Sequence, residues 1–144
     1  MRLEQGALVA YSNKKGLLFI VKACEGFEKL LSPEGEKCVT KLFKEITQKV
    51  KEPTEVLDYY KEIKELFKKL RSSLGLEKVG LYIYDIENSY PLEGEKNLDN
   101  LVQLIESETI WEKPMLAYSR CLEDTPIVRI YDLDNSQVFE PTAV

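Results

Sequence analysis

The chain has 144 residues, 44% of them hydrophobic, and a formal net charge of −5 at pH 7. This length is sufficient for one domain that buries its own core. The longest purely apolar stretch covers residues 17–21, far short of the roughly 20 residues of a membrane-spanning helix, and no secretory signal pattern begins the chain. We therefore expect a cytoplasmic protein without a membrane partner.

Residues 7–31 allow two interpretations. Apolar side chains at Ile20, Cys24, Phe27 and Leu31 recur at helical spacing and favour a helix over residues 17–31. Alternatively, the apolar segments 7–11 and 17–21 flank Ser-Asn-Lys-Lys-Gly, a pattern that indicates a β-hairpin. We favour the helix.

A second helix is predicted to begin at Ser32-Pro33-Glu34, because serine caps free N–H groups and proline is tolerated in the first turn. It should end near Glu52, since the residue before Pro53 is disfavoured in helical geometry. Its predicted apolar face consists of Val39, Leu42, Phe43, Ile46 and Val50.

A third helix is predicted over residues 54–74, with Gly75 as its C-terminal stop. Its apolar residues recur at alternating spacings of four and three, which indicates a continuous packing seam. The seam consists of Val56, Tyr60, Ile63, Phe67, Leu70 and Leu74.

The second half of the chain has the β-branched and aromatic character of strands. Strands are predicted at 79–84, 115–121 and 127–131, with a short fourth at 137–140 and a short helix over 97–105. The predicted class is α+β: a helix-rich N-terminal half (1–76) with two or three packed helices, then a small, mainly antiparallel sheet with one short helix (77–144). We expect one compact unit.

The residue content excludes several kinds of chemistry. The chain has no histidine, which removes Ser-His and Cys-His nucleophilic catalysis. Its three cysteines are widely spaced without a Cys-x-x-Cys pair, so neither a structural zinc site nor a disulfide framework is expected. Enzymatic chemistry would depend on carboxylates, lysines and tyrosines, and we therefore favour a non-catalytic protein.

Charge is distributed unevenly along the chain. Residues 1–76 hold 15 basic and 11 acidic side chains, net +4, whereas residues 77–144 hold 5 and 14, net −9. Such asymmetry is typical of a chain with one side that faces a polyanion and another that faces a partner. In addition, 16 lysines and 19 glutamates against 5 asparagines and 4 glutamines indicate a thermophilic source.

A row of cations follows one side of the third predicted helix, where it suits a nucleic-acid backbone or an acidic partner. For the row taken alone we favour a solvated face, because Glu55, Asp58, Glu62 and Glu65 lie at i+3 and i+4 spacing from the lysines and suit helix-stabilising ion pairs. The row consists of Lys61, Lys64, Lys68, Lys69 and Arg71.

Two similar segments lie 47 residues apart, Ile83-Tyr-Asp-Ile-Glu-Asn-Ser89 and Ile130-Tyr-Asp-Leu-Asp-Asn-Ser136. Each is typical of a strand that runs into a turn stabilised by Asp and Asn side chains. If the two strands are neighbours, the turns gather four carboxylates that suit Mg²⁺ or Mn²⁺. These are Asp85, Glu87, Asp132 and Asp134.

Together these patterns favour a non-catalytic interaction or adaptor protein, a small subunit that docks a protein or nucleic acid and needs no cofactor. One alternative is a metal-dependent phosphodiesterase or nuclease that uses the four carboxylates. Another is a homodimeric structural module that pairs through the seam helix.

Overall fold

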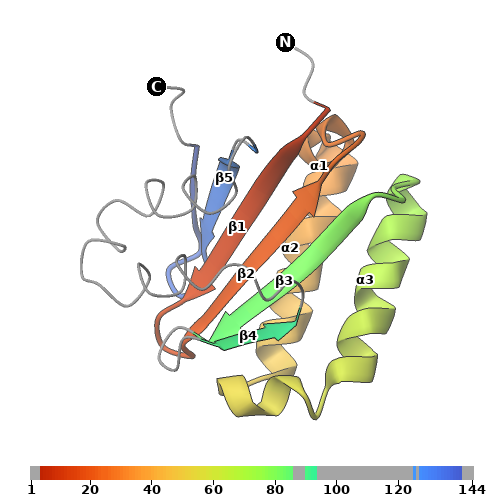
Figure 1. Cartoon of the computed structure of the whole chain (residues 1–144). Helices are drawn as coiled ribbons and strands as arrows, with labels where there is room; N and C mark the ends of the chain where they lie inside the picture. Colours follow the sequence, from red (N-terminus) through yellow and green to blue (C-terminus); the bar gives the residue numbers. More distant parts are fainter. Residues whose placement is uncertain (1–3, 86–89, 94–124, 126, 141–144) are drawn as a thin grey trace.

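The computed structural model describes residues 4–85, 90–93, 125 and 127–140 (Figure 1). Within them, a six-stranded mixed sheet has the order β4-β3-β2-β1-β5-β6. Strand β1 is parallel to β5, and every other neighbouring pair is antiparallel. The elements in chain order are β1 (Gly6–Ser12), β2 (Leu17–Ala23), α1 (Glu28–Leu31), α2 (Pro33–Lys49), η1 (Pro53–Val56), α3 (Tyr60–Leu74), β3 (Val79–Asp85), β4 (Tyr90–Glu93), β5 (Ile127–Asp132) and β6 (Gln137–Phe139).

The N-terminal segment forms the central hairpin of the sheet. Strands β1 and β2 pair in register from Gly6 opposite Ala23 to Ser12 opposite Leu17. The helix favoured for residues 17–31 is therefore wrong, and the hairpin alternative is confirmed. The reason is burial: residues 17–21 are buried on both faces of the sheet, and such a strand lacks the apolar-polar alternation that distinguishes it from a buried helix.

Helices α2 and α3 lie on the same side of the sheet and cover one of its faces (Figure 1). The core beneath them takes alternate side chains of each strand, such as Leu8 and Phe19, because successive side chains of a strand point to opposite faces. The intervening side chains on the other face, such as Val9 and Ile20, are also buried.

The predicted order of helices and strands is therefore wrong. Two strands precede the helices, and both are central in a sheet that joins the two halves of the chain. The sheet is mixed because β5 runs parallel to β1. The strand predicted at 115–121 and the helix predicted at 97–105 lie outside the described residues. Nowhere in the described part of the chain is a helix both long and apolar enough to cross a membrane.

The helix boundaries follow local chemistry. Ser32 caps α2 as predicted, its Oγ accepting from the Gly35 N–H at 3.0 Å. The third helix begins later than predicted: a 3₁₀ turn ends at Val56, and α3 starts at Tyr60. At its end Gly75 has φ +63°, the left-handed conformation in which a helix stops most readily at glycine.

Gly35 provides a test of how closely α1 and α2 pack. A Cβ at this position would lie 2.0 Å from the Lys29 carbonyl oxygen and 2.7 Å from Leu30 Cα. Although alanine is the better helix former, we expect Gly35→Ala to lower the free energy of unfolding by about 2 kcal/mol, because backbone atoms must move. Denaturant unfolding measures this loss.

The matched control is Gly75→Ala, where the added Cβ meets nothing closer than 3.8 Å and only the positive φ opposes it. We expect this variant to lose about 1 kcal/mol. Equal stability of Gly35→Ala and the wild type would contradict the packing of α1 on α2.

Candidate functional site

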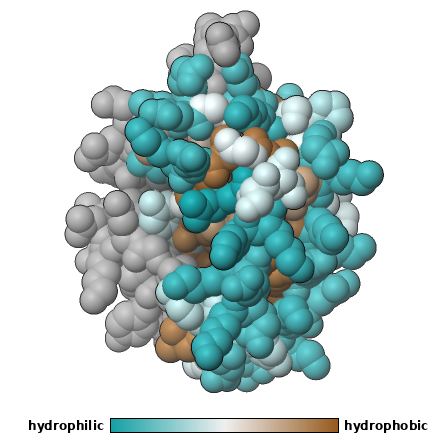
Figure 2. Space-filling view, turned by 90° about the vertical axis from the view of Figure 1, so that its right-hand side faces the viewer, coloured by the Kyte–Doolittle hydropathy of each residue, from teal (hydrophilic) through white to brown (hydrophobic). Residues whose placement is uncertain are grey.

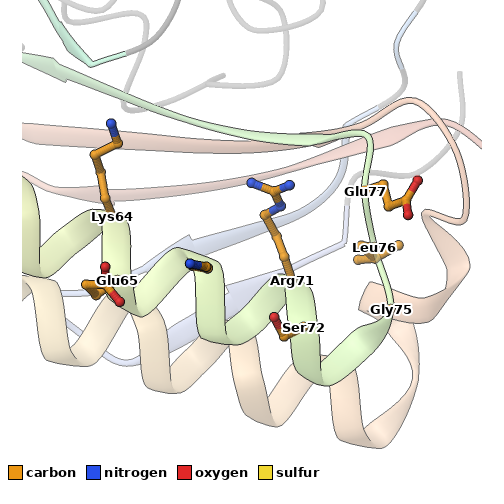
Figure 3. A pocket seen from close by; sticks show the side chains of 8 residues that line it. Lys64, Glu65, Arg71, Ser72, Gly75, Leu76 and Glu77 are labelled. Atoms are coloured by element: carbon orange, nitrogen blue, oxygen red, sulfur yellow. The ribbon is translucent and has the colours of Figure 1, made fainter.

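An open groove of about 530 Å³ runs along one side of α3 and the segment that follows it. Figure 2 turns this side of the molecule to the viewer: hydrophilic residues dominate, and hydrophobic ones show in a band between them. The lining residues are Lys64, Glu65, Lys68, Arg71, Ser72, Gly75, Leu76 and Glu77 (Figure 3).

The amphipathic character of α3 decides which of its side chains reach this groove. Ile63 and Leu70 are buried in the core and fix the rotation of the helix about its axis. Because residues three and four apart share a helix face, Lys64, Lys68 and Arg71 then lie together along one border of the buried stripe. Three of the five predicted cations therefore meet in one groove.

The other two predicted cations are placed differently. Lys69 lines a separate groove of about 150 Å³ between α2 and α3, together with residues such as Cys38 and Leu42. Lys61 is exposed near the start of α3 and is not part of either groove lining. Lys69 therefore does not join the cation row of which the sequence predicted it to be part.

The ion pairs expected along α3 do not form. Between described residues, ion pairs join Lys41 to Glu45, Lys78 to Glu25, and Arg129 to Glu36 and Glu140. None of the five predicted cations has a carboxylate partner among those residues. Lys64 instead places its Nζ 4.7 Å from the centre of the Tyr60 ring. The cations of α3 are therefore not held in direct ion pairs with its acidic row, although Glu65 lines the same groove as Lys64, Lys68 and Arg71.

Arg71 is the least exposed cation of the groove. Its side chain is half-buried, and its Nε atom is inaccessible to solvent yet has no hydrogen-bond partner among the residues that the structure describes. Figure 3 shows Lys64 and Arg71 extending to the same side of α3, whereas the Glu65 side chain does not extend with them. The Glu77 carboxylate points away from Arg71. The guanidinium group therefore brings an unused donor to the side of α3 to which Lys64 also extends.

Sequence reasoning missed the far wall of the groove, residues 75–77. The left-handed Gly75 reverses the chain, and the Leu76 N–H then donates to the Arg71 carbonyl at 2.9 Å. Leu76 is buried, whereas Glu77 is exposed. The glycine stop signal itself was present in the sequence, and it indicates that the residues after a helix fold back against its last turn.

The structure separates Asp85 from Asp132 and Asp134, the three predicted metal ligands that it describes. Strands β3 and β5 end at the same edge of the sheet, but β2 and β1 separate them by about 14 Å, three strand spacings. Asp85 pairs with Leu17 on the helix-covered face, whereas Asp132 pairs with Tyr11 on the other. Glu87 lies outside the described residues. Those that are described contain no group of three or more metal-ligating side chains.

Asp132 and Asp134 instead stabilise two interlocked turns. The Asp132 carboxylate accepts from the backbone N–H groups of Asp134 and Asn135, as predicted for a plain turn. Asp134 reaches the turn between β1 and β2, where it accepts from Ser12 Oγ at 2.7 Å and from the Lys14 N–H at 3.1 Å. The hydrogen bonds of Asp132 stabilise the turn after β5, and those of Asp134 link this turn to the one between β1 and β2.

Tyr11 is a buried titratable group next to Asp132 in these turns. Burial, with the neighbouring and hydrogen-bonded Asp132, raises the pKa of Tyr11 from 10.0 to about 12. Because the folded state favours the neutral phenol, Tyr11 contributes stability below pH 10, and this contribution is lost as the pH rises from 10 to 12.

We expect the difference in free energy of unfolding between the wild type and Tyr11→Phe to shrink across this range. Denaturant unfolding of both proteins at several pH values measures the difference, and its constancy below pH 9 is the internal control. A difference that stays constant up to pH 12 would contradict the raised pKa.

Comparison of the chain with protein-family models, curated proteins and solved structures finds no match. Any assignment of function therefore rests on the groove itself.

Proposed function

We propose that this chain is a non-catalytic interaction protein, a small subunit or adaptor that docks a polyanionic partner along the cationic side of α3. The observation that carries the proposal is the groove in which Lys64, Lys68 and Arg71 meet without a carboxylate partner among the described residues. A cytoplasmic location, a thermophilic source and a nucleic-acid-handling assembly belong to the same proposal.

Electrostatics supports such a role. A row of cations on one straight helix presents charge over about 15 Å from Lys61 to Arg71, at 1.5 Å per residue. A chain with a net charge of −5 repels polyanions at long range, so attraction depends on this local surface. Binding of this kind is weakened by salt, because the partner's counterions are released when lysines and arginines replace them.

The apolar seam of α3 does not favour a homodimer. Ile63 and Leu70 are buried in the chain's own core, and Leu66, Phe67 and Leu74 pack against it. Much of the surface on which the dimer hypothesis depends therefore already packs within the chain. The alternative of a metal-dependent hydrolase has no supporting observation among the described residues, since Asp85 and Asp132 lie on opposite faces of the sheet.

The test is fluorescence anisotropy with labelled single- and double-stranded oligonucleotides and a labelled poly-glutamate peptide, at low and near-physiological salt. We expect salt-sensitive binding to at least one of them. Replacing Lys61, Lys64, Lys68 and Arg71 by alanine should abolish binding, because it removes the cations that attract the polyanion. Variants with only some of these changes should bind with a smaller salt dependence, since each lost contact releases roughly one counterion fewer.

The matched control replaces four exposed lysines of α2 by alanine and changes the net charge by the same amount. Its binding should be close to that of the wild type if the site is local. If both variants lost affinity equally, binding would depend on net charge alone and the site on α3 would be contradicted. Absence of binding to every probe would also overturn the proposal. The control positions are Lys37, Lys41, Lys44 and Lys49.

A further inference from the structure

The donors of the groove define the shape of the group that fits it. Arg71 offers a planar fork of N–H donors, and its Nε is buried without an acceptor. Lys64 and Lys68 come from the two preceding turns of α3 and line the same groove. An arginine fork with two ammonium groups matches an anion that has several oxygens and more than one negative charge.

Phosphate meets this description better than carboxylate. A terminal phosphoryl group presents three acceptor oxygens and up to two negative charges, and a nucleic-acid backbone presents a row of phosphodiesters with one charge each. A single carboxylate presents two oxygens and one charge. Arginine binds phosphate through two parallel hydrogen bonds, and lysines add charge around it. Two carboxylates, Glu65 and Glu77, also line the groove, and the Glu77 carboxylate points away from Arg71 (Figure 3).

We propose that this groove is a binding site for a phosphate group, with Arg71 as the residue that recognises it and Lys64 and Lys68 as its charge partners. The inference rests on the proposed function and names the chemistry of the partner. The phosphate belongs either to a small phosphorylated molecule or to a nucleic-acid backbone. The open groove admits both, since it leaves the rest of the ligand in solvent.

The experiment is an NMR titration of the ¹⁵N-labelled protein, which follows the arginine Nε–H signals and the backbone amides of residues 64–77. Pyrophosphate is the phosphate probe and citrate the carboxylate probe, compared at equal ionic strength. The Arg71 signal is identified by its loss in Arg71→Lys, which keeps the charge and removes the fork.

We expect pyrophosphate to shift the Arg71 Nε–H signal and to bind more tightly than citrate. Arg71→Lys should weaken pyrophosphate binding roughly tenfold, the effect of losing a charge-assisted hydrogen bond. Lys69→Ala is the matched control, because this cation of the same helix lines the other groove, and it should leave the affinity unchanged.

A third titration with a twelve-residue oligothymidylate distinguishes the two sources of phosphate. If it shifts the same signals and competes with pyrophosphate, the ligand is a nucleic-acid backbone; if only pyrophosphate binds, the ligand is a small phosphorylated molecule.

Citrate binding as tightly as pyrophosphate, or an unchanged affinity in Arg71→Lys, would overturn the inference. A poly-glutamate peptide that binds through α3 without such a phosphate preference would leave the proposed function in place. If no anionic probe binds, both fail.

Discussion

The pairing of β1 with two partners at once is the constraint on which the rest of this structure depends. Strand β1 is hydrogen-bonded to β2, its neighbour in sequence, and to β5, which lies more than 100 residues further along the chain. The second pairing is reinforced at its end, where Leu133 donates to the Tyr11 carbonyl and Ser12 donates to Asp134. Because side chains on both faces of the central strands are buried, a shift of one residue in either pairing would move apolar groups out of their places. The acidic turn after β5 is therefore part of the contacts that fix this pairing.

The cationic groove is a consequence of how α3 is anchored to this sheet. Ile63 and Leu70 enter the core, and a helix whose apolar stripe is buried has no freedom to rotate about its axis. Lys64, Lys68 and Arg71 then follow one border of the stripe, and Lys69 follows the border that faces α2. Helix α3 lies at the edge of the sheet away from β5, so the groove and the interlocked turns are on opposite sides of the molecule (Figure 1). A change at one of them should leave the other intact.

The unpaired charges on α3 are physically reasonable in the free protein. Exposed ion pairs between flexible side chains contribute only about 0–1 kcal/mol, so lysines remain solvated at little cost. Arg71 differs because its Nε is removed from solvent without gaining an acceptor, and a buried donor left unsatisfied costs about 1–3 kcal/mol. A phosphate in the groove would reach this Nε only if the Arg71 side chain shifted. The phosphate inference centres on Arg71 because its guanidinium fork matches phosphate geometry, which a lysine ammonium does not.

Local chemistry in the sequence determined the capped start of α2, the glycine stop of α3 and the strand segments at β3 and β5, since each depends on neighbouring residues alone. It also placed Lys64, Lys68 and Arg71 on one helix side, because helical spacing is local. Only the tertiary structure decided that residues 17–21 form a strand, because burial on both faces hides its alternation. It likewise decided that Asp85 and Asp132 lie on opposite faces of the sheet, since the strand order and register place residues that are far apart in the sequence.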